Sequence, residues 1–178
     1  LGIEPALNVS KVAHEKKIPT ISKFFGVKTA KELVGNNIFA DLLLGNNVLA
    51  HVPNVNDFVE GMKIILKKQG VITMEFPHIL QLIKNNQFDT IYHEHFSYFS
   101  FHIVQKIFSY HNLRIFDVEE LSTHGGSLRI YAKHEEDKTK SITENVKSLN
   151  DKEVEFGCNN IKNYNKFQER VDKVKEDV

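Results

Sequence analysis

The sequence predicts an α/β protein in which a mostly parallel sheet carries helices on both faces. From residue 1 to about residue 85, short apolar segments typical of strands alternate with segments whose apolar residues have helical spacing. Leu42 to Leu44 form a continuous apolar run, as expected of a strand covered on both faces. Strands that alternate with helices pair in parallel, because each helix returns the chain to the starting end of the sheet.

The first elements are short. Residues 1–5 have the pattern of the end of a buried strand, and residues 9–17 follow with helical spacing and Asn8 as the expected cap. Residues 18–25 are rich in β-branched and aromatic side chains and predict a second strand. A glycine and two asparagines end the helix expected over residues 29–34.

The next elements are longer. Residues 39–47 contain the leucine run and predict a strand, and residues 56–68 have the clearest helical pattern of the chain. Gly70 is the expected cap of this helix, and a strand over residues 71–76 is stopped by a proline. The helix repeats its apolar side chains at i, i+4, i+7 and i+8: Phe58, Met62, Ile65 and Leu66.

After residue 85 the strict alternation is lost. Residues 78–84 are helical in pattern and residues 87–98 have no clean period. The remaining elements expected are a helix capped by Ser100 and ending at residue 110, strands over residues 113–118 and 127–132, and polar helical sequence from residue 135. One helical face near the end is apolar and needs a packing partner: Phe167, Val171, Val174 and Val178.

The composition excludes several classes of protein. The chain has 178 residues, with 23 lysines and arginines against 23 aspartates and glutamates, so no excess charge favours nucleic acid or an anionic membrane as partner. No apolar run approaches the roughly 20 residues that span a bilayer. A single cysteine, Cys158, excludes an internal disulfide and a cysteine-rich zinc site. We expect a soluble, cytoplasmic protein.

Both ends of the sequence suggest an excerpt of a longer chain. A buried strand rarely begins a natural protein, and the apolar face over residues 163–178 calls for further polypeptide. None of the nine glycines forms a glycine-rich phosphate loop, which would be expected just before the first visible strand.

Polar and aromatic residues follow the expected strands where ligands bind in a parallel sheet. Glu4 ends the first strand, where a carboxylate can accept hydrogen bonds from the ribose of a nucleotide-like cofactor; an ordinary surface glutamate is the alternative. Phe25 ends the second strand and can flank an adenine ring or pack in the core. Asn46 and Asn47 end the third, as cofactor ligands or as a turn, and His51 follows.

The segment Tyr92-His93-Glu94-His95 is the densest polar cluster of the chain. A histidine beside a carboxylate is a natural general base near neutral pH, and the neighbouring Glu94 can fix its tautomer. A metal site is the alternative, because His-x-His in an extended segment directs both rings to one side. Its third ligand would come from elsewhere in the chain: Glu75, His78 or His124.

The sequence His124-Gly125-Gly126 joins two expected strands. Two glycines permit a positive φ angle and a close approach of backbone to ligand. A simple hairpin turn needs no histidine, which favours a substrate-facing role.

The strings EFPHILQLIKNNQFDTIYHEHFSYFS and VEELSTHGGSLRIYAKH resemble the signature of sugar C-methyltransferases, which methylate C-3 of nucleotide-linked 4-keto deoxysugars. GNNVLAHVPNVNDFVEGMKIILKKQGVITMEFP is similar to the middle region of that family, and GIEPALNVSKVAHEKKIPT to the segment after its glycine loop. The resemblance covers the chain to about residue 134 and extends more loosely to its end.

The resemblance implies a class I S-adenosylmethionine-dependent methyltransferase core, Rossmann-like, whose last strand over residues 127–132 runs antiparallel. Residues 1–134 would be part of this core, and residues 135–178 a helical lead-in to a C-terminal domain. The first strand, the glycine loop, an N-terminal zinc-binding lobe and the C-terminal domain would lie outside this sequence.

The resemblance also implies roles for single residues. His95 would remove the proton from C-3 of the nucleotide-linked keto sugar, with Glu94 and Tyr92 in the same site and His51 close to the reacting centre. Methyl transfer from S-adenosylmethionine needs no metal. The remaining residues would bind the two ligands: Glu4 the ribose, Phe25 the adenine, Asn46 and Asn47 the methionine end, and His93, His124 and Gly125 the sugar substrate.

Two other functions remain open from the sequence. An O- or N-methyltransferase would use the same cofactor but would not require the Tyr-His-Glu-His cluster. A non-catalytic binding fragment is the second alternative, since half of the cofactor pocket would lie outside the sequence.

Overall fold

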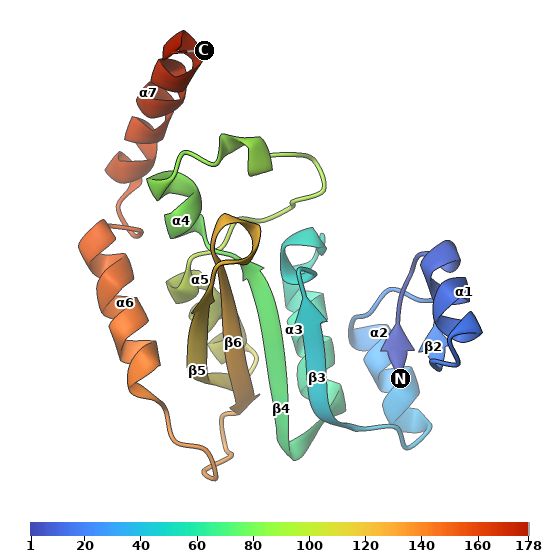
Figure 1. The fold of residues 1–178 in the computed structure, drawn as a ribbon. Coiled ribbons are helices and arrows are strands. Elements are labelled where there is room, and N and C mark those ends of the chain that lie inside the picture. The colour runs from blue at the N-terminus through green and yellow to red at the C-terminus, as the bar shows by residue number, and fades with distance from the viewer. Residues whose placement is uncertain (178) are drawn as a thin grey trace.

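The computed structural model describes residues 1–177 and confirms an α/β fold (Figure 1). The elements are β1 (Gly2–Ile3), α1 (Leu7–Glu15), β2 (Thr20–Ile21), α2 (Val27–Gly35), β3 (Ala40–Asn46), η1 (Leu49–His51), α3 (Val55–Ile65), β4 (Leu66–Pro77), α4 (Ile79–Lys84), η2 (Phe88–Thr90), α5 (Phe101–Tyr110), β5 (Leu113–Leu121), η3 (Thr123–Gly125), β6 (Ser127–His134), α6 (Glu144–Phe156) and α7 (Ile161–Asp177).

The main sheet has four strands in the order β3-β4-β6-β5. β3 and β4 pair in parallel up to Asn46 and Glu75, so both strands present their carboxyl ends at the same edge. β6 is antiparallel to both β4 and β5, which confirms the antiparallel strand expected over residues 127–132. This order places β6 inside the sheet and β5 at its edge.

β1 and β2 form a separate two-stranded parallel sheet at the side of β3 (Figure 1). This small sheet joins the rest of the molecule through α2, which packs against α3. The two helices approach closely: a Cβ atom on Gly61 would lie 2.7 Å from the backbone carbon of Gly26. Glycine is therefore required at position 61 for this packing.

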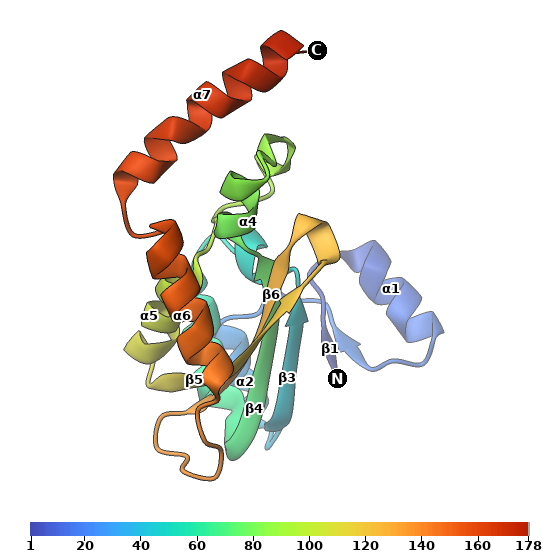
Figure 2. The ribbon, with the colours of Figure 1, turned by 60° about the vertical axis from the view of Figure 1, so that its left-hand side comes forward.

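The core lies between the main sheet and the helices behind it (Figures 1 and 2). Alternate residues of β4 and β6 point to this side because side chains alternate across a strand. α3 and α5 cover them, and α6 packs beside α5 along β5. The side chains at its centre are almost inaccessible to solvent: Ile72, Met74, Phe76, Val104, Phe108, Leu128 and Ile130.

The opposite face of the sheet is more open than the sequence predicted. Leu42 and Leu44 are 53% and 71% exposed, so β3 is not covered on both faces within residues 1–177. Arg129 and Tyr131 occupy the same sheet with partly exposed side chains. The helices expected on both faces of the main sheet therefore lie mainly on one.

Several element boundaries differ from those predicted. The strand expected over residues 18–25 is reduced to two residues, and α1 begins at Leu7 after Ala6, without a capping side chain from Asn8. α3 ends at Ile65, and Gly70 lies inside β4 because Leu66 already pairs with Ala40 of β3. Strand pairing has overridden the local helical pattern.

Other expectations are confirmed. The Ser100 side chain accepts a hydrogen bond from the backbone N–H of Ile103 at the start of α5. The expected C-terminal apolar stripe lies on α7, which extends away from the body of the molecule (Figure 2); its last member, Val178, is outside the described residues. Among the helices of residues 1–177, none combines the length and the apolar character needed to cross a membrane.

Candidate active site

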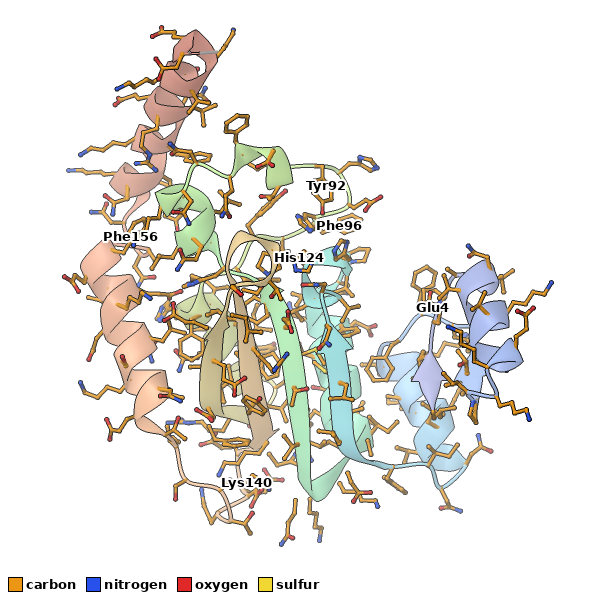
Figure 3. All side chains as sticks on the ribbon, in the orientation of Figure 1. Glu4, Tyr92, Phe96, His124, Lys140 and Phe156 are labelled. Atoms are coloured by element: carbon orange, nitrogen blue, oxygen red, sulfur yellow. The ribbon has the colours of Figure 1, made fainter. Side chains whose placement is uncertain are left out.

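The residues of the expected catalytic cluster lie on the loop between α4 and α5. Figure 3 shows Tyr92 and Phe96 of this loop, and His124 of the β5–β6 turn, at the end of the molecule where β3 and β4 finish. Backbone N–H groups of Phe96 and Ser97 donate to the carbonyl oxygen of Ala50, over 2.9 and 3.3 Å. The loop is thereby attached to η1, which follows β3.

Each ring nitrogen of His95 has a hydrogen-bond partner. Its Nδ1 atom lies 3.0 Å from the carbonyl oxygen of Thr90, and its Nε2 atom lies 3.1 Å from the hydroxyl of Tyr92. A carbonyl oxygen only accepts, so Nδ1 carries the proton and the lone pair of neutral His95 is on Nε2. The Tyr92 hydroxyl then donates to Nε2, which is the basic nitrogen of the site.

Aromatic rings restrict the orientation of His95. Tyr92 stacks on it with ring centroids 4.3 Å apart, and His51 meets it edge-on at 4.7 Å. Tyr98 packs against it at 5.6 Å, also edge-on. The predicted proximity of His51, Tyr92 and His95 is thus found.

His93 and Glu94 point to solvent. Both are exposed, and neither side chain makes a hydrogen bond within residues 1–177. The expectation that Glu94 fixes the tautomer of His95 is wrong in this structure, because the carbonyl of Thr90 does so. A main-chain acceptor leaves no trace in the residue types, so sequence reasoning could not find it.

The end of β3 meets the β5–β6 turn through Asn47 and His124. The Asn47 Nδ2 atom lies 3.3 Å from both ring nitrogens of His124. Both residues have a positive φ angle, 53° and 52°, a conformation that asparagine tolerates better than most residues. The Oδ1 atom of Asn47 is buried and has no hydrogen-bond partner in the described part of the chain, whereas Asn46 is exposed.

The glycines of the turn approach protein atoms. The Nε2 atom of Gln87 donates to the carbonyl oxygen of Gly125 over 2.8 Å, and the Gln87 side chain fills the space that a Cβ atom of Gly125 would need. Gln81 packs against Gly126 in the same way. The sequence predicted that the Gly-Gly backbone approaches a ligand, and that stays a prediction; in the structure two glutamines that the sequence did not single out occupy this space.

Two other residues predicted to bind the cofactor lie beside the small sheet. The Oε1 atom of Glu4, at the end of β1, accepts the backbone N–H of Ala6 over 2.7 Å. Figure 3 shows Glu4 apart from Tyr92, Phe96 and His124. Phe25 is half-buried and meets Phe58 edge-on at 5.4 Å, so this ring packs partly in the core.

The residues considered as a third metal ligand are engaged elsewhere. Glu75 accepts from the hydroxyl of Thr123 over 2.8 Å and from Arg129 over 3.0 Å. The hydrogen bond from Arg129 to Glu75 raises the pKa of the guanidinium. His78 binds Glu153. In residues 1–177 no three His, Cys, Asp or Glu side chains are grouped as a metal site requires.

Similar solved structures define the class of fold. A SAM-dependent methyltransferase from Thermotoga maritima matches with a TM-score of 0.58 at 14% identity, over 75% of this chain and 72% of that one. A SAM-dependent methyltransferase from Anabaena variabilis matches with a TM-score of 0.57 at 11% identity, over 75% and 67%. The fold is therefore that of the class I SAM-dependent methyltransferases.

Sequence comparison places the chain more closely. Residues 122–178 match the family model of the C-methyltransferase C-terminal domain. The C-methyltransferase NovU of Streptomyces niveus is 37% identical over 132 residues, which are 74% of this chain and 31% of that protein. Both matches confirm the resemblance to C-methyltransferases seen in the sequence, and the chain spans about a third of the length of this relative.

Proposed function

We propose that this chain forms the core of an S-adenosylmethionine-dependent C-methyltransferase that methylates the carbon next to the ketone of a nucleotide-linked keto-deoxysugar. The observation that carries the proposal is the state of His95. Its proton is held on Nδ1 by Thr90, and its lone pair is on Nε2 at the carboxyl edge of the sheet. Carbon methylation requires a positioned base of this kind, because a carbon bound to hydrogen has no free electron pair.

The first step is proton removal. The Nε2 atom of His95 takes the proton from the carbon next to the ketone, and the electron pair of that C–H bond moves to the carbonyl oxygen as an enolate. A base positioned in this way contributes about 10²- to 10⁴-fold to rate. The Tyr92 hydroxyl, which donates to Nε2 in the free protein, is released when substrate takes that position and can donate to the enolate oxygen.

The second step forms the new C–C bond. S-adenosylmethionine supplies an electrophilic methyl group on a sulfonium. The enolate carbon would take that methyl group, and the sulfonium would leave as a neutral thioether with the electrons of the broken carbon–sulfur bond. The residues of this chain contribute by orientation: the His51 and Tyr98 rings confine His95, and the attachment of the loop to Ala50 fixes its distance from β3.

The residues at the sheet edge fit the cofactor. Asn47 has a buried Oδ1 atom without a partner in residues 1–177, which suits the ammonium group at the methionine end. The only hydrogen bond of the Glu4 carboxylate among the described residues is the one with Ala6, which leaves Oε2 to accept from a ribose hydroxyl. Phe25 keeps its role beside the adenine as part of this proposal, with one edge of its ring against Phe58.

In this proposal the α4–α5 loop and the β5–β6 turn supply the substrate side. His124 is exposed on the β5–β6 turn. His93, Glu94 and Phe96 are exposed on the loop over residues 85–100 between α4 and α5, which we call the catalytic loop. Histidines at such a place suit the anionic phosphates and the hydroxyls of a nucleotide sugar.

The decisive experiment separates carbon methylation from its alternatives. The natural full-length protein is incubated with a nucleotide-linked 4-keto-deoxysugar and S-adenosylhomocysteine in deuterated water, and exchange of the proton next to the ketone is followed by NMR. We expect exchange in the wild type and none in His95→Gln. An O- or N-methyltransferase would transfer methyl groups without such exchange, and a non-catalytic fragment would show neither reaction.

A further inference from the structure

A single carboxylate on α6 reaches both ends of the segment that carries the catalytic loop. The Oε1 atom of Glu153 accepts from Nε2 of His78 over 2.7 Å and from the backbone N–H of Phe101 over 2.6 Å. Its Oε2 atom accepts from the backbone N–H of His102 over 3.0 Å. His78 comes directly after β4, and Phe101 opens α5, so Glu153 joins the two points between which the loop is suspended.

Backbone hydrogen bonds join the same two ends of the segment. Ile79 donates to the carbonyl oxygen of Phe99 over 3.0 Å, which closes the segment into a loop. The backbone N–H of His78 donates to Gly126 over 3.0 Å, so the β5–β6 turn that holds His124 is attached at the same place. The catalytic loop and the β5–β6 turn are thus both connected to the buried pair of His78 and Glu153.

Arg170 of α7 provides a second attachment. Its Nη2 atom donates to the carbonyl oxygen of Ile83 over 2.8 Å, and its Nε atom donates to Oδ1 of Asn86 over 2.9 Å. Asn86 has a positive φ of 53° and marks the residue where the chain leaves α4 for the loop. Two helices that follow the sheet therefore hold the loop where it begins and where it ends.

The pair of Glu153 and His78 is almost completely buried. Glu153 and His78 are each 1% exposed. Burial by itself raises the pKa of the Glu153 carboxyl, but hydrogen bonds from His78 and from the backbone of His102 and Phe101 outweigh it and lower the pKa. A buried hydrogen-bonded carboxylate is no strong argument for stability, because the cost of removing its charge from water offsets most of the attraction. Its geometry instead indicates a role in holding the loop.

We infer that Glu153, assisted by Arg170, is a positioning residue for His95: a carboxylate from α6 clamps the two ends of residues 78–102 and keeps the base over the ends of β3 and β4. This inference rests on the proposed function for its catalytic part only. The mechanical part, that Glu153 orders the loop, stands on the contacts alone.

The test compares Glu153→Gln with Glu155→Gln in the natural full-length protein. Glu155 lies on the same helix with an exposed side chain. Glu153→Gln keeps the shape of the side chain but places an NH₂ group against N–H donors. We expect backbone amides of residues 86–99 to exchange with deuterated water about tenfold faster in Glu153→Gln, by mass spectrometry, with β4 and β6 protected as in the wild type.

Catalysis provides the second readout. Misplacement of a base by about 1 Å costs about a hundredfold in rate, so substrate proton exchange should fall about 10- to 100-fold in Glu153→Gln. S-adenosylhomocysteine affinity should stay within about threefold of the wild type, because Glu4 and Asn47 are not held by Glu153. Glu153→Asp should recover part of the rate. Arg170→Ala leaves the His78–Glu153 pair in place and should speed amide exchange over residues 83–90.

The outcomes are distinguishable. Unchanged amide exchange over residues 86–99 in both Glu153→Gln and Arg170→Ala would overturn the positioning role. A parallel loss of cofactor binding and proton exchange would also overturn it, since that is the result of general unfolding. Faster amide exchange together with a wild type that never exchanges substrate protons would leave the clamp standing and refute the proposed function.

Discussion

The Nδ1 atom of His95 lies 3.0 Å from the carbonyl oxygen of Thr90, and this contact decides which ring nitrogen of the neutral imidazole carries the lone pair. Thr90 ends the short helix η2, five residues before His95. Histidines that act as bases are commonly held through their second nitrogen by a carboxylate or a backbone carbonyl. The carbonyl of Thr90 holds Nδ1 of His95 in this way, and the neighbouring Glu94 is exposed to solvent.

The first prediction concerns His95. In the natural full-length protein, His95→Gln should bind cofactor and sugar normally and lower the rate of methyl transfer by about 10²- to 10⁴-fold, as expected for loss of a positioned base. His14→Gln, on the exposed side of α1, is the control and should be neutral. Near-normal turnover of His95→Gln, or activity that follows a metal bound at His93 and His95, would refute the general-base assignment.

The second prediction concerns Glu4 and the cofactor. A carboxylate that holds ribose hydroxyls makes charge-assisted hydrogen bonds of roughly 1.5–3 kcal/mol. Glu4→Ala in the natural full-length protein should therefore weaken S-adenosylhomocysteine binding by about ten- to a hundredfold in calorimetry. Unchanged affinity would show that Glu4 only closes the turn with Ala6.

The third prediction concerns acid stability. The pKa of Glu153 in the folded protein is below its ordinary value of 4.5. As the pH falls below 4.5, the unfolded chain takes up the proton first, so the stability contributed by this group is complete above that pH and is lost progressively through the lower folded pKa.

The comparison with a neutral side chain follows from that sign. Glu153→Gln should be less stable than the wild type at pH 7, and its free energy of unfolding should fall less steeply below pH 4.5. Urea titrations at several pH values measure both slopes. Identical slopes would mean that this carboxylate has the same pKa in the folded and unfolded chains.

The fourth prediction concerns the contact between α2 and α3. Gly61→Ala places a Cβ atom 2.7 Å from the backbone of Gly26, which cannot move aside as a flexible side chain can. Overpacking of this kind costs about 1–3 kcal/mol in the free energy of unfolding. Gly35→Ala is the matched control, because its Cβ atom meets nothing within 4 Å. Equal stability of the two variants would contradict the close packing.

The fifth prediction concerns the exposed edge strand β3. Leu42 and Leu44 are 53% and 71% exposed on a strand that pairs on one side only among residues 1–177. An apolar strand edge of this kind promotes association, so the 178-residue chain alone should self-associate. Leu44→Lys should reduce the apparent mass in light scattering at little cost in stability. A monodisperse wild-type chain would refute this expectation.

The sequence alone indicated many of the local elements and the resemblance to C-methyltransferases. The Ser100 cap, the apolar face of α3 and the polar residues at the ends of β1 and β3 follow from side chains close together in the chain, where spacing reports the contact directly. The cluster around His95 and the resemblance to C-methyltransferases were readable for the same reason.

Tertiary structure alone decided which contacts hold His95 and the loop around it. Gly70 became part of a strand because Leu66 pairs with Ala40, a contact that local helical spacing cannot anticipate. The tautomer of His95 depends on a backbone carbonyl, which every residue possesses and no residue type reveals. His78 and Glu153 are separated by 75 residues, and only the packing of α6 against β5 and α5 brings the carboxylate to the ends of the loop.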